Sequence, residues 1–108
     1  MSDDLVQFLR DRLDEDAEGA NNIHDRQSDA YLDGDCICEY PARVIAEVEA
    51  KRRVVQALGS AEVSLRNTEP GREPHELMTG AANSLRAAVR MLAAVYVDHP
   101  DYRAEWRP

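Results

Sequence analysis

Three stretches of the chain repeat apolar residues at helical spacing, and this periodicity constrains the fold more than any other feature. In the first stretch the repeating positions are Leu5, Phe8, Leu9 and Leu13. Steps of three and four residues place them on one face of an α-helix. Charged residues, Arg12 among them, stand between the apolar ones and predict a solvent-facing side. We expect an amphipathic helix over residues 3–20, which weakens after Gly19, where Asn21 and Asn22 favour turns.

A second stripe predicts the clearest helix, over residues 41–65. Its apolar members are Val44, Ile45, Val48, Val55 and Leu58. Pro41 suits the start of a helix, because its missing N–H has no helical partner there. Gly59 either ends this helix or is tolerated at a cost of about 1 kcal/mol. A polar, breaker-rich linker over residues 66–74 follows in both cases.

The third stripe predicts a helix over residues 75–98. It consists of Leu85, Val89, Leu92 and Tyr96, with alanines beside them that allow close helix approach. Pro100 cannot continue a helix and disfavours helical geometry at His99. In the tail, residues 99–108, Tyr102 and Trp106 either fold back over the helices or stay exposed as anchors for a partner.

These elements predict one all-α domain, residues 1–108, with a three-helix, bundle-like architecture. Aromatic residues make up only 6% of the chain, so aliphatic side chains and alanine must fill most of the core. Residues 21–40 read as an irregular loop. Within it, Asp33-Gly34 has the composition of a tight turn and suggests a short β-hairpin.

Charge divides the chain unevenly. The net charge is −8, but residues 1–49 carry 14 acidic and 4 basic side chains, against 7 and 9 in residues 50–108. Either the acidic half meets a basic partner, or it packs near Lys51, Arg52 and Arg53 of its own chain. The acidic balance and the sequence pI of about 4.8 disfavour nucleic-acid binding, although Arg86 and Arg90 share a helix face. Without a secretory signal or an apolar run that would span a bilayer, we expect a cytoplasmic protein that binds no membrane.

Two motifs resemble those of a known family. One is Pro41-Ala42-Arg43-Val44, followed by Glu47-Val48-Glu49-Ala50-Lys51-Arg52-Arg53, and the other is the ending Asp98-His99-Pro100-Asp101-Tyr102-Arg103-Ala104-Glu105-Trp106-Arg107-Pro108. The chain is similar to small uncharacterised proteins of actinobacteria and their phages, which form a domain family of unknown function. Glu39-Tyr40 stand where members commonly have a His-Asp pair, so the Asp cap is missing. The resemblance implies a cytosolic helical protein, phage-derived in one interpretation, and supplies no activity.

Two patterns are candidate metal sites. Cys36-x-Cys38 would bind zinc if His24, Asp33, Asp35 or His75 completed four ligands, but the paired spacing of structural zinc sites is absent. The alternative is two reduced cysteines that pack as small apolar groups. Glu15-x-x-Glu18 and Glu73-x-x-Glu76 approximate the paired carboxylates of all-α nucleotide hydrolases, without the final Asp. We expect no bound metal, no cofactor and no catalytic residue.

The sequence thus predicts a non-enzymatic protein-interaction or regulatory module with an acidic recognition face. The residues expected to bind the partner are Asp11, Asp14, Glu15, Asp16, Tyr102 and Trp106. A stronger version makes the acidic face a mimic of DNA, and a homodimer is a further expectation, because the stripes are wider than a minimal bundle needs. The alternatives are a metal-dependent nucleotide hydrolase and a zinc-stabilised adaptor.

Overall fold

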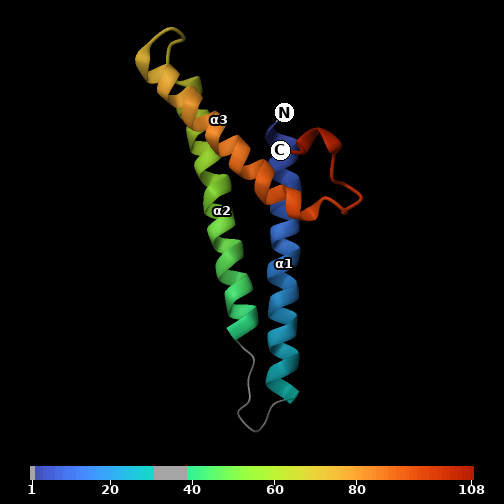
Figure 1. The fold of residues 1–108 in the computed structure, drawn as a ribbon. Coiled ribbons are helices and arrows are strands. Elements are labelled where there is room, and N and C mark those ends of the chain that lie inside the picture. The colour runs from blue at the N-terminus through green and yellow to red at the C-terminus, as the bar shows by residue number, and fades with distance from the viewer. Residues whose placement is uncertain (1, 31–38) are drawn as a thin grey trace.

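The computed structural model describes residues 2–30 and 39–108, and these residues form three long helices and a C-terminal tail (Figure 1). The elements are α1 (Ser2–Ala30), α2 (Glu39–Arg66), α3 (Glu73–Ala93) and the short 3₁₀ helices η1 (Ala94–Tyr96) and η2 (Ala104–Trp106). The all-α, three-helix prediction is confirmed. Within the described ranges no helix is long and apolar enough to cross a membrane.

The helices form an elongated hairpin with a returning arm. Figure 1 shows α1 and α2 side by side in opposite directions, with α2 extending past the start of α1. The third helix returns from the far end of α2 and crosses the N-terminal part of α1, where the tail also folds back (Figure 1). The molecule measures 64 × 27 × 16 Å, and its radius of gyration is 18.0 Å. A compact chain of this length would have a radius of gyration of about 13 Å.

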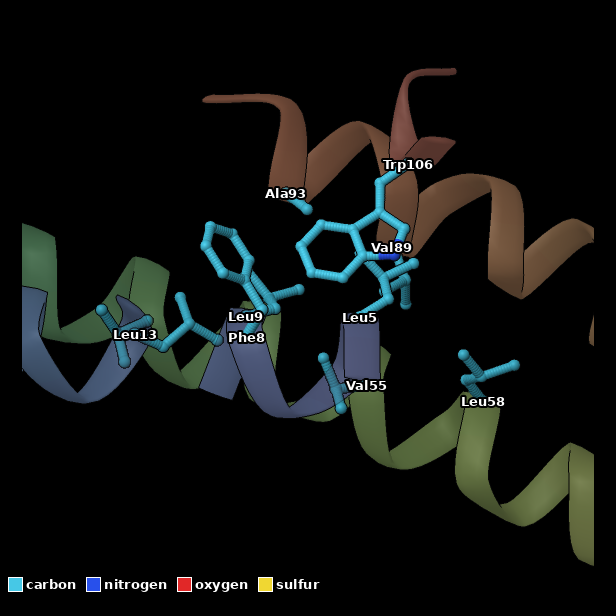
Figure 2. Packing of buried hydrophobic residues seen from close by; sticks show 10 residues of the cluster. Leu5, Phe8, Leu9, Leu13, Val55, Leu58, Val89, Ala93 and Trp106 are labelled. Atoms are coloured by element: carbon cyan, nitrogen blue, oxygen red, sulfur yellow. The ribbon is translucent and has the colours of Figure 1, made fainter. Parts of the chain in front are cut away.

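The core lies where all three helices and the tail meet (Figure 2). It contains Leu5, Phe8, Leu9 and Leu13 from α1, Val48, Val55 and Leu58 from α2, Val89 and Ala93 from α3, and Trp106 from the tail. The apolar stripes of the sequence therefore supply most of the core. Hydrophobic burial along one side of each helix is what holds the arrangement together.

The first helix is longer than predicted. It continues through Gly19, Asn21 and Asn22 to Ala30, so residues 21–30 are not part of a loop. One glycine in a helix costs about 1 kcal/mol, and Ala20, which is buried, remains in register with the core face. The expected hairpin at Asp33-Gly34 and the pair Cys36 and Cys38 lie outside the described residues.

The other two helices also differ from prediction at their ends. The second begins at Glu39, passes through Gly59 and ends at Arg66. The third runs from Glu73 to Ala93 and then tightens into η1, so it ends short of residue 98. A 3₁₀ turn is a common way to end a helix. The linker is shorter than expected, and Gly71, with φ of 85°, supplies the left-handed conformation of its turn.

Candidate functional site

An aromatic cluster fastens the C-terminal tail to α1. Phe8 lies at its centre, and the centroid of its ring is 5.1 Å from that of Trp106, 5.5 Å from His99 and 5.8 Å from Tyr102. All three of these neighbours come from the tail, and Figure 2 shows Trp106 reaching from the tail toward α1. Trp106 is only 6% exposed. The fold-back interpretation of Tyr102 and Trp106 therefore matches the structure, and Trp106 offers little surface to a partner.

Arg12 is buried in this cluster, contrary to its expected place on the outer face of the first helix. Its side chain is 10% exposed, and its guanidinium carbon lies 5.1 Å from the centroid of the Phe8 ring. Nη1 lies 2.6 Å from Nε2 and 3.0 Å from Nδ1 of the His99 imidazole. Nη2 donates to Oε1 of Glu15 at 2.9 Å. One guanidinium thus binds the turn at His99 to the middle of α1.

Tyr96 forms a second connection between the end of α3 and α1. Its hydroxyl donates a short hydrogen bond of 2.5 Å to Asp16. Burial, together with this bond to a carboxylate, raises the pKa of Tyr96 above its ordinary value. The hydroxyl of Tyr102 is also buried, but it has no hydrogen-bond partner among the described residues. The cluster is therefore built for packing and for holding carboxylates in place.

The four acidic residues predicted to form the recognition face all lie on α1, and each accepts a hydrogen bond from its own chain. Asp11 accepts from Gln7, and Asp14 accepts from Arg52 at 2.7 Å. Arg12 and Tyr96 hold Glu15 and Asp16 respectively, as described above. The acidic half thus packs in part against the basic cluster of α2, as one of the two interpretations of the charge pattern predicted.

Arg52 joins the two helices through their charged surfaces. Besides Asp14 it binds Glu49 at 2.7 Å, a partner three residues earlier on α2. Hydrogen bonds to Asp14 and Glu49 raise the pKa of Arg52. Because these side chains lie in contact with solvent, we regard the pairs as fixing geometry more than stability.

A groove of about 390 Å³ lies between α1 and α2 beside these carboxylates. We call it the acidic groove, and it is lined by Glu15, Asp16, Gly19, Ala20, Val44, Glu47, Val48 and Lys51. Three carboxylates therefore face one ammonium group. A Cβ added at Gly19 would meet nothing within 4 Å, so this wall of the groove is open.

A carboxylate accepts several hydrogen bonds at once, so Glu15 and Asp16 keep acceptor capacity beyond their internal partners. The groove can take a cationic group.

A larger groove of about 790 Å³ lies where the start of α1 and the tail meet α2 and α3. Its charged walls include Arg66, Arg86, Arg90 and Arg103, and Leu5, Leu65 and Trp106 supply apolar surface. Carboxylates balance two of the arginines, since Glu62 lies 3.3 Å from Arg86 and Asp4 lies 3.0 Å from Arg103. Arg66 and Arg90 form no ion pair with any described residue. We call this the arginine groove, and its surface carries both signs of charge.

The carboxylate pairs considered for metal binding do not share a cleft. Glu15 and Glu18 lie on α1 near the end of α3, whereas Glu73 and Glu76 open α3. That helix has 21 residues, so the two pairs are on the order of 30 Å apart. Among residues 3–22 and 41–108, whose side chains the structure describes, no three His, Cys, Asp or Glu gather as a metal site. His75, one of the residues weighed as a zinc ligand, instead contacts the hydroxyl of Thr68 at 3.0 Å.

These features define an elongated three-helix protein with a structural aromatic cluster and two open surface grooves. The chain belongs to the DUF6221 family, a family of unknown function, whose model matches residues 2–108. The expected membership in an uncharacterised family is thereby confirmed. Neither a curated protein nor a solved structure matches the chain.

Sequence reasoning missed the burial of Arg12 and the contribution of Glu47. Arg12 follows Leu5 and Phe8 by seven and four residues, so it occupies the same face of α1. That spacing is a signal that could have identified its burial. Glu47 gave no such signal, because its place beside Glu15 depends on how α2 lies against α1.

Proposed function

We propose that this protein is a non-enzymatic interaction module whose acidic groove binds a lysine or arginine side chain of a cytoplasmic partner protein. The observation that carries the proposal is the placement of Glu15, Asp16 and Glu47 around one open groove. An arginine or lysine side chain has a slender stem and a cationic head, which suit a groove with apolar walls and a carboxylate rim.

The carboxylates of α1 are held in position before any partner binds. Arg12 holds Glu15 at 2.9 Å, and Tyr96 holds Asp16 at 2.5 Å. Both donors belong to the aromatic cluster, so the rim of the groove is attached to the core. Side chains fixed in advance lose less conformational entropy on binding, and this increases affinity.

The net negative charge of the protein also favours a basic partner protein. The net charge is −8, and the acidic residues concentrate in the first half of the chain. A field of this sign attracts basic proteins over distances comparable to the Debye length, about 8 Å at physiological ionic strength. We expect association that weakens as salt concentration rises.

The experiment compares three immobilised proteins for what they retain from a lysate of the source organism, read by quantitative mass spectrometry. They are the wild type, the groove variant E15Q/E47Q, and the control variant E73Q/E76Q. Both variants remove two carboxylates, but Glu73 and Glu76 are exposed in the first turn of α3, far from the groove. Far-UV circular dichroism checks that all three proteins keep their helical content.

The proposal predicts a protein that the wild type and E73Q/E76Q retain equally, that E15Q/E47Q retains poorly, and that high salt releases. A partner retained equally by all three proteins would contradict the groove as the site. A partner lost from both variants would show that net charge alone decides, and this would also contradict the proposal.

A further inference from the structure

The arginine groove is built by four parts of the chain and has the size of a ligand site. Its volume is about 790 Å³, and its walls come from the first turn of α1, the end of α2, α3 and the tail. Figure 1 shows the two chain ends together, close to where α3 crosses α1. Sites for small organic molecules commonly measure about 300–1,000 Å³. The groove is therefore large enough for a molecule of this kind.

The floor of the groove belongs to the core and therefore has a fixed shape. Leu5 is 4% exposed and Trp106 is 6% exposed, and both pack in the core cluster. Leu65, near the end of α2, adds a half-buried apolar side chain. A preformed apolar floor covers part of a ligand without a rearrangement of the fold. A fitting ligand accordingly has an apolar body.

The side of the groove formed by α2 and α3 carries a net positive charge. Arg66 ends α2, and Arg86 and Arg90 stand one turn apart on α3. Glu62 is the one carboxylate that these helices contribute to the groove, and it pairs with Arg86 at 3.3 Å. Arg66 and Arg90 are exposed and form no ion pair with any described residue. Two guanidinium groups are thus left for an anionic group, which arginine binds through paired N–H donors.

The side of the groove formed by α1 and the tail carries the opposite charge. Asp3 and Asp4 open α1, and the tail contributes Arg103 and Glu105. Arg103 pairs with Asp4 at 3.0 Å and with Glu105 at 3.6 Å. Asp3 forms no ion pair with any described residue. One carboxylate is thus left for a cationic group, and the two beside Arg103 share a single guanidinium.

The ion pairs named above each lie within one side of the groove, and none of them crosses it. Opposite charges therefore line the two sides, and their sum over the groove is zero. A molecule with one anionic and one cationic end matches this arrangement. The net charge of −8 repels a simple anion, and the arginines repel a simple cation, but a molecule without net charge meets neither penalty.

We propose that the arginine groove binds a small zwitterion of the ω-amino acid type, in which an aliphatic body separates a carboxylate from an ammonium group. Arg66 and Arg90 bind the carboxylate, and Asp3 binds the ammonium group. The aliphatic body covers Leu5 and Trp106, and the apolar surface removed from water adds to the affinity. This site is separate from the acidic groove, so the inference does not depend on the function proposed above.

The first experiment titrates the ¹⁵N-labelled protein with 6-aminohexanoate and follows the indole N–H of Trp106 by nuclear magnetic resonance. Trp106 is the only tryptophan of the chain, so its indole signal is unambiguous. Hexanoate and hexylamine are matched probes that carry only the carboxylate or only the ammonium group. We expect a saturable shift with 6-aminohexanoate and an affinity at least about tenfold lower for either single-charge probe. The amide of Gly19, which lies at the acidic groove, should not shift with 6-aminohexanoate.

The second experiment repeats the titration with two variants. R66Q/R90Q removes both guanidinium groups that are left for the carboxylate, and it should bind 6-aminohexanoate at least about tenfold more weakly. The control R10Q/R43Q removes two exposed arginines that do not line the groove, and it should keep the wild-type affinity. All four side chains are exposed, so both variants should keep the helical content of the wild type, which far-UV circular dichroism checks.

Three results would overturn the proposal. One is an indole signal of Trp106 that does not respond to 6-aminohexanoate, and another is a single-charge probe that binds as tightly as the zwitterion. The third is an equal affinity of R66Q/R90Q and R10Q/R43Q for 6-aminohexanoate. If both variants lost affinity alike, the net charge of the chain and not the groove would be responsible.

Discussion

Replacing Trp106 with alanine tests whether the tail is an integral part of the fold. The indole is 6% exposed, and the centroid of its ring lies 5.1 Å from that of Phe8 and 5.7 Å from that of Tyr102. The guanidinium of Arg103 covers it at 5.2 Å. Trp106→Ala therefore removes the only large side chain by which η2 enters the core cluster.

The loss of stability expected for Trp106→Ala follows from the area that the indole buries. A buried tryptophan removes 150–250 Å² from water, and at about 25 cal/mol per Å² this corresponds to roughly 4–6 kcal/mol. Because the unfolded chain already buries part of this area and alanine keeps a methyl group, we expect a loss of about 3–5 kcal/mol. The free energy of unfolding of such a domain is about 5–15 kcal/mol, so the variant should still fold.

The assay is thermal and urea-induced unfolding followed by far-UV circular dichroism. A loss of this size should lower the melting temperature by roughly 12–20 °C. Trp106→Phe, which keeps an aromatic ring against Phe8, is the matched control and should lose less than half as much. In the wild type, fluorescence of the single tryptophan should change together with the helical signal.

Two results would refute the reasoning. One is a loss below about 1 kcal/mol for Trp106→Ala, because a docked tail cannot give so small a value. The other is a wild-type fluorescence transition that precedes the loss of helix, since it would mean that the tail leaves the helices before they unfold.

Further predictions concern single contacts and can be checked by the same unfolding assays. Arg12→Ala should cost about 3 kcal/mol, because it removes the packing over Phe8 and leaves His99 and Glu15 without the guanidinium. Arg12→Met also removes the guanidinium but retains the packing over Phe8, so it should cost clearly less. Equal losses would contradict a role for this packing. The pKa of Tyr96 is raised in the folded protein, so the folded state keeps the phenol protonated while the unfolded chain ionises near pH 10. The free energy of unfolding should therefore fall as the pH rises above 10. Tyr96→Phe should flatten this fall, which alkaline unfolding curves would show. Gly59→Ala should raise stability by up to about 1 kcal/mol, since its Cβ would meet nothing within 4 Å, but Gly71→Ala should lower stability by roughly as much because φ is 85° there. If the two glycine variants shifted stability in the same direction, the helical position of Gly59 or the turn at Gly71 would be wrong.

The helices were predictable because burial repeats with the period of the helix. Leu5, Phe8, Leu9 and Leu13 are all buried, as their spacing indicates. Helix ends were less predictable, because they depend on small local preferences. The turn preference of Asn21 and Asn22 amounts to less than a few kcal/mol, and continued backbone hydrogen bonding extends α1 to Ala30.

The site was only partly predictable because its contacts join distant segments. Arg12 and His99 are 87 residues apart, and Tyr96 and Asp16 are 80 residues apart. No local pattern states that these pairs meet. The sequence indicated an acidic first helix, but the groove also requires Glu47 from α2, whose position follows only from the packing of the two helices.

The acidic groove can be tested most directly by nuclear magnetic resonance of the ¹⁵N-labelled protein, titrated with a short arginine-rich peptide. The backbone amide of Gly19 lies at the groove, and glycine amides are resolved from most others. We predict that the largest shift changes occur at Glu15, Gly19 and Glu47, disappear at high salt, and are absent from the E15Q/E47Q variant. Changes of equal size spread over the other carboxylates of α1, or changes that persist in this variant, would contradict the assignment of the groove as the recognition site.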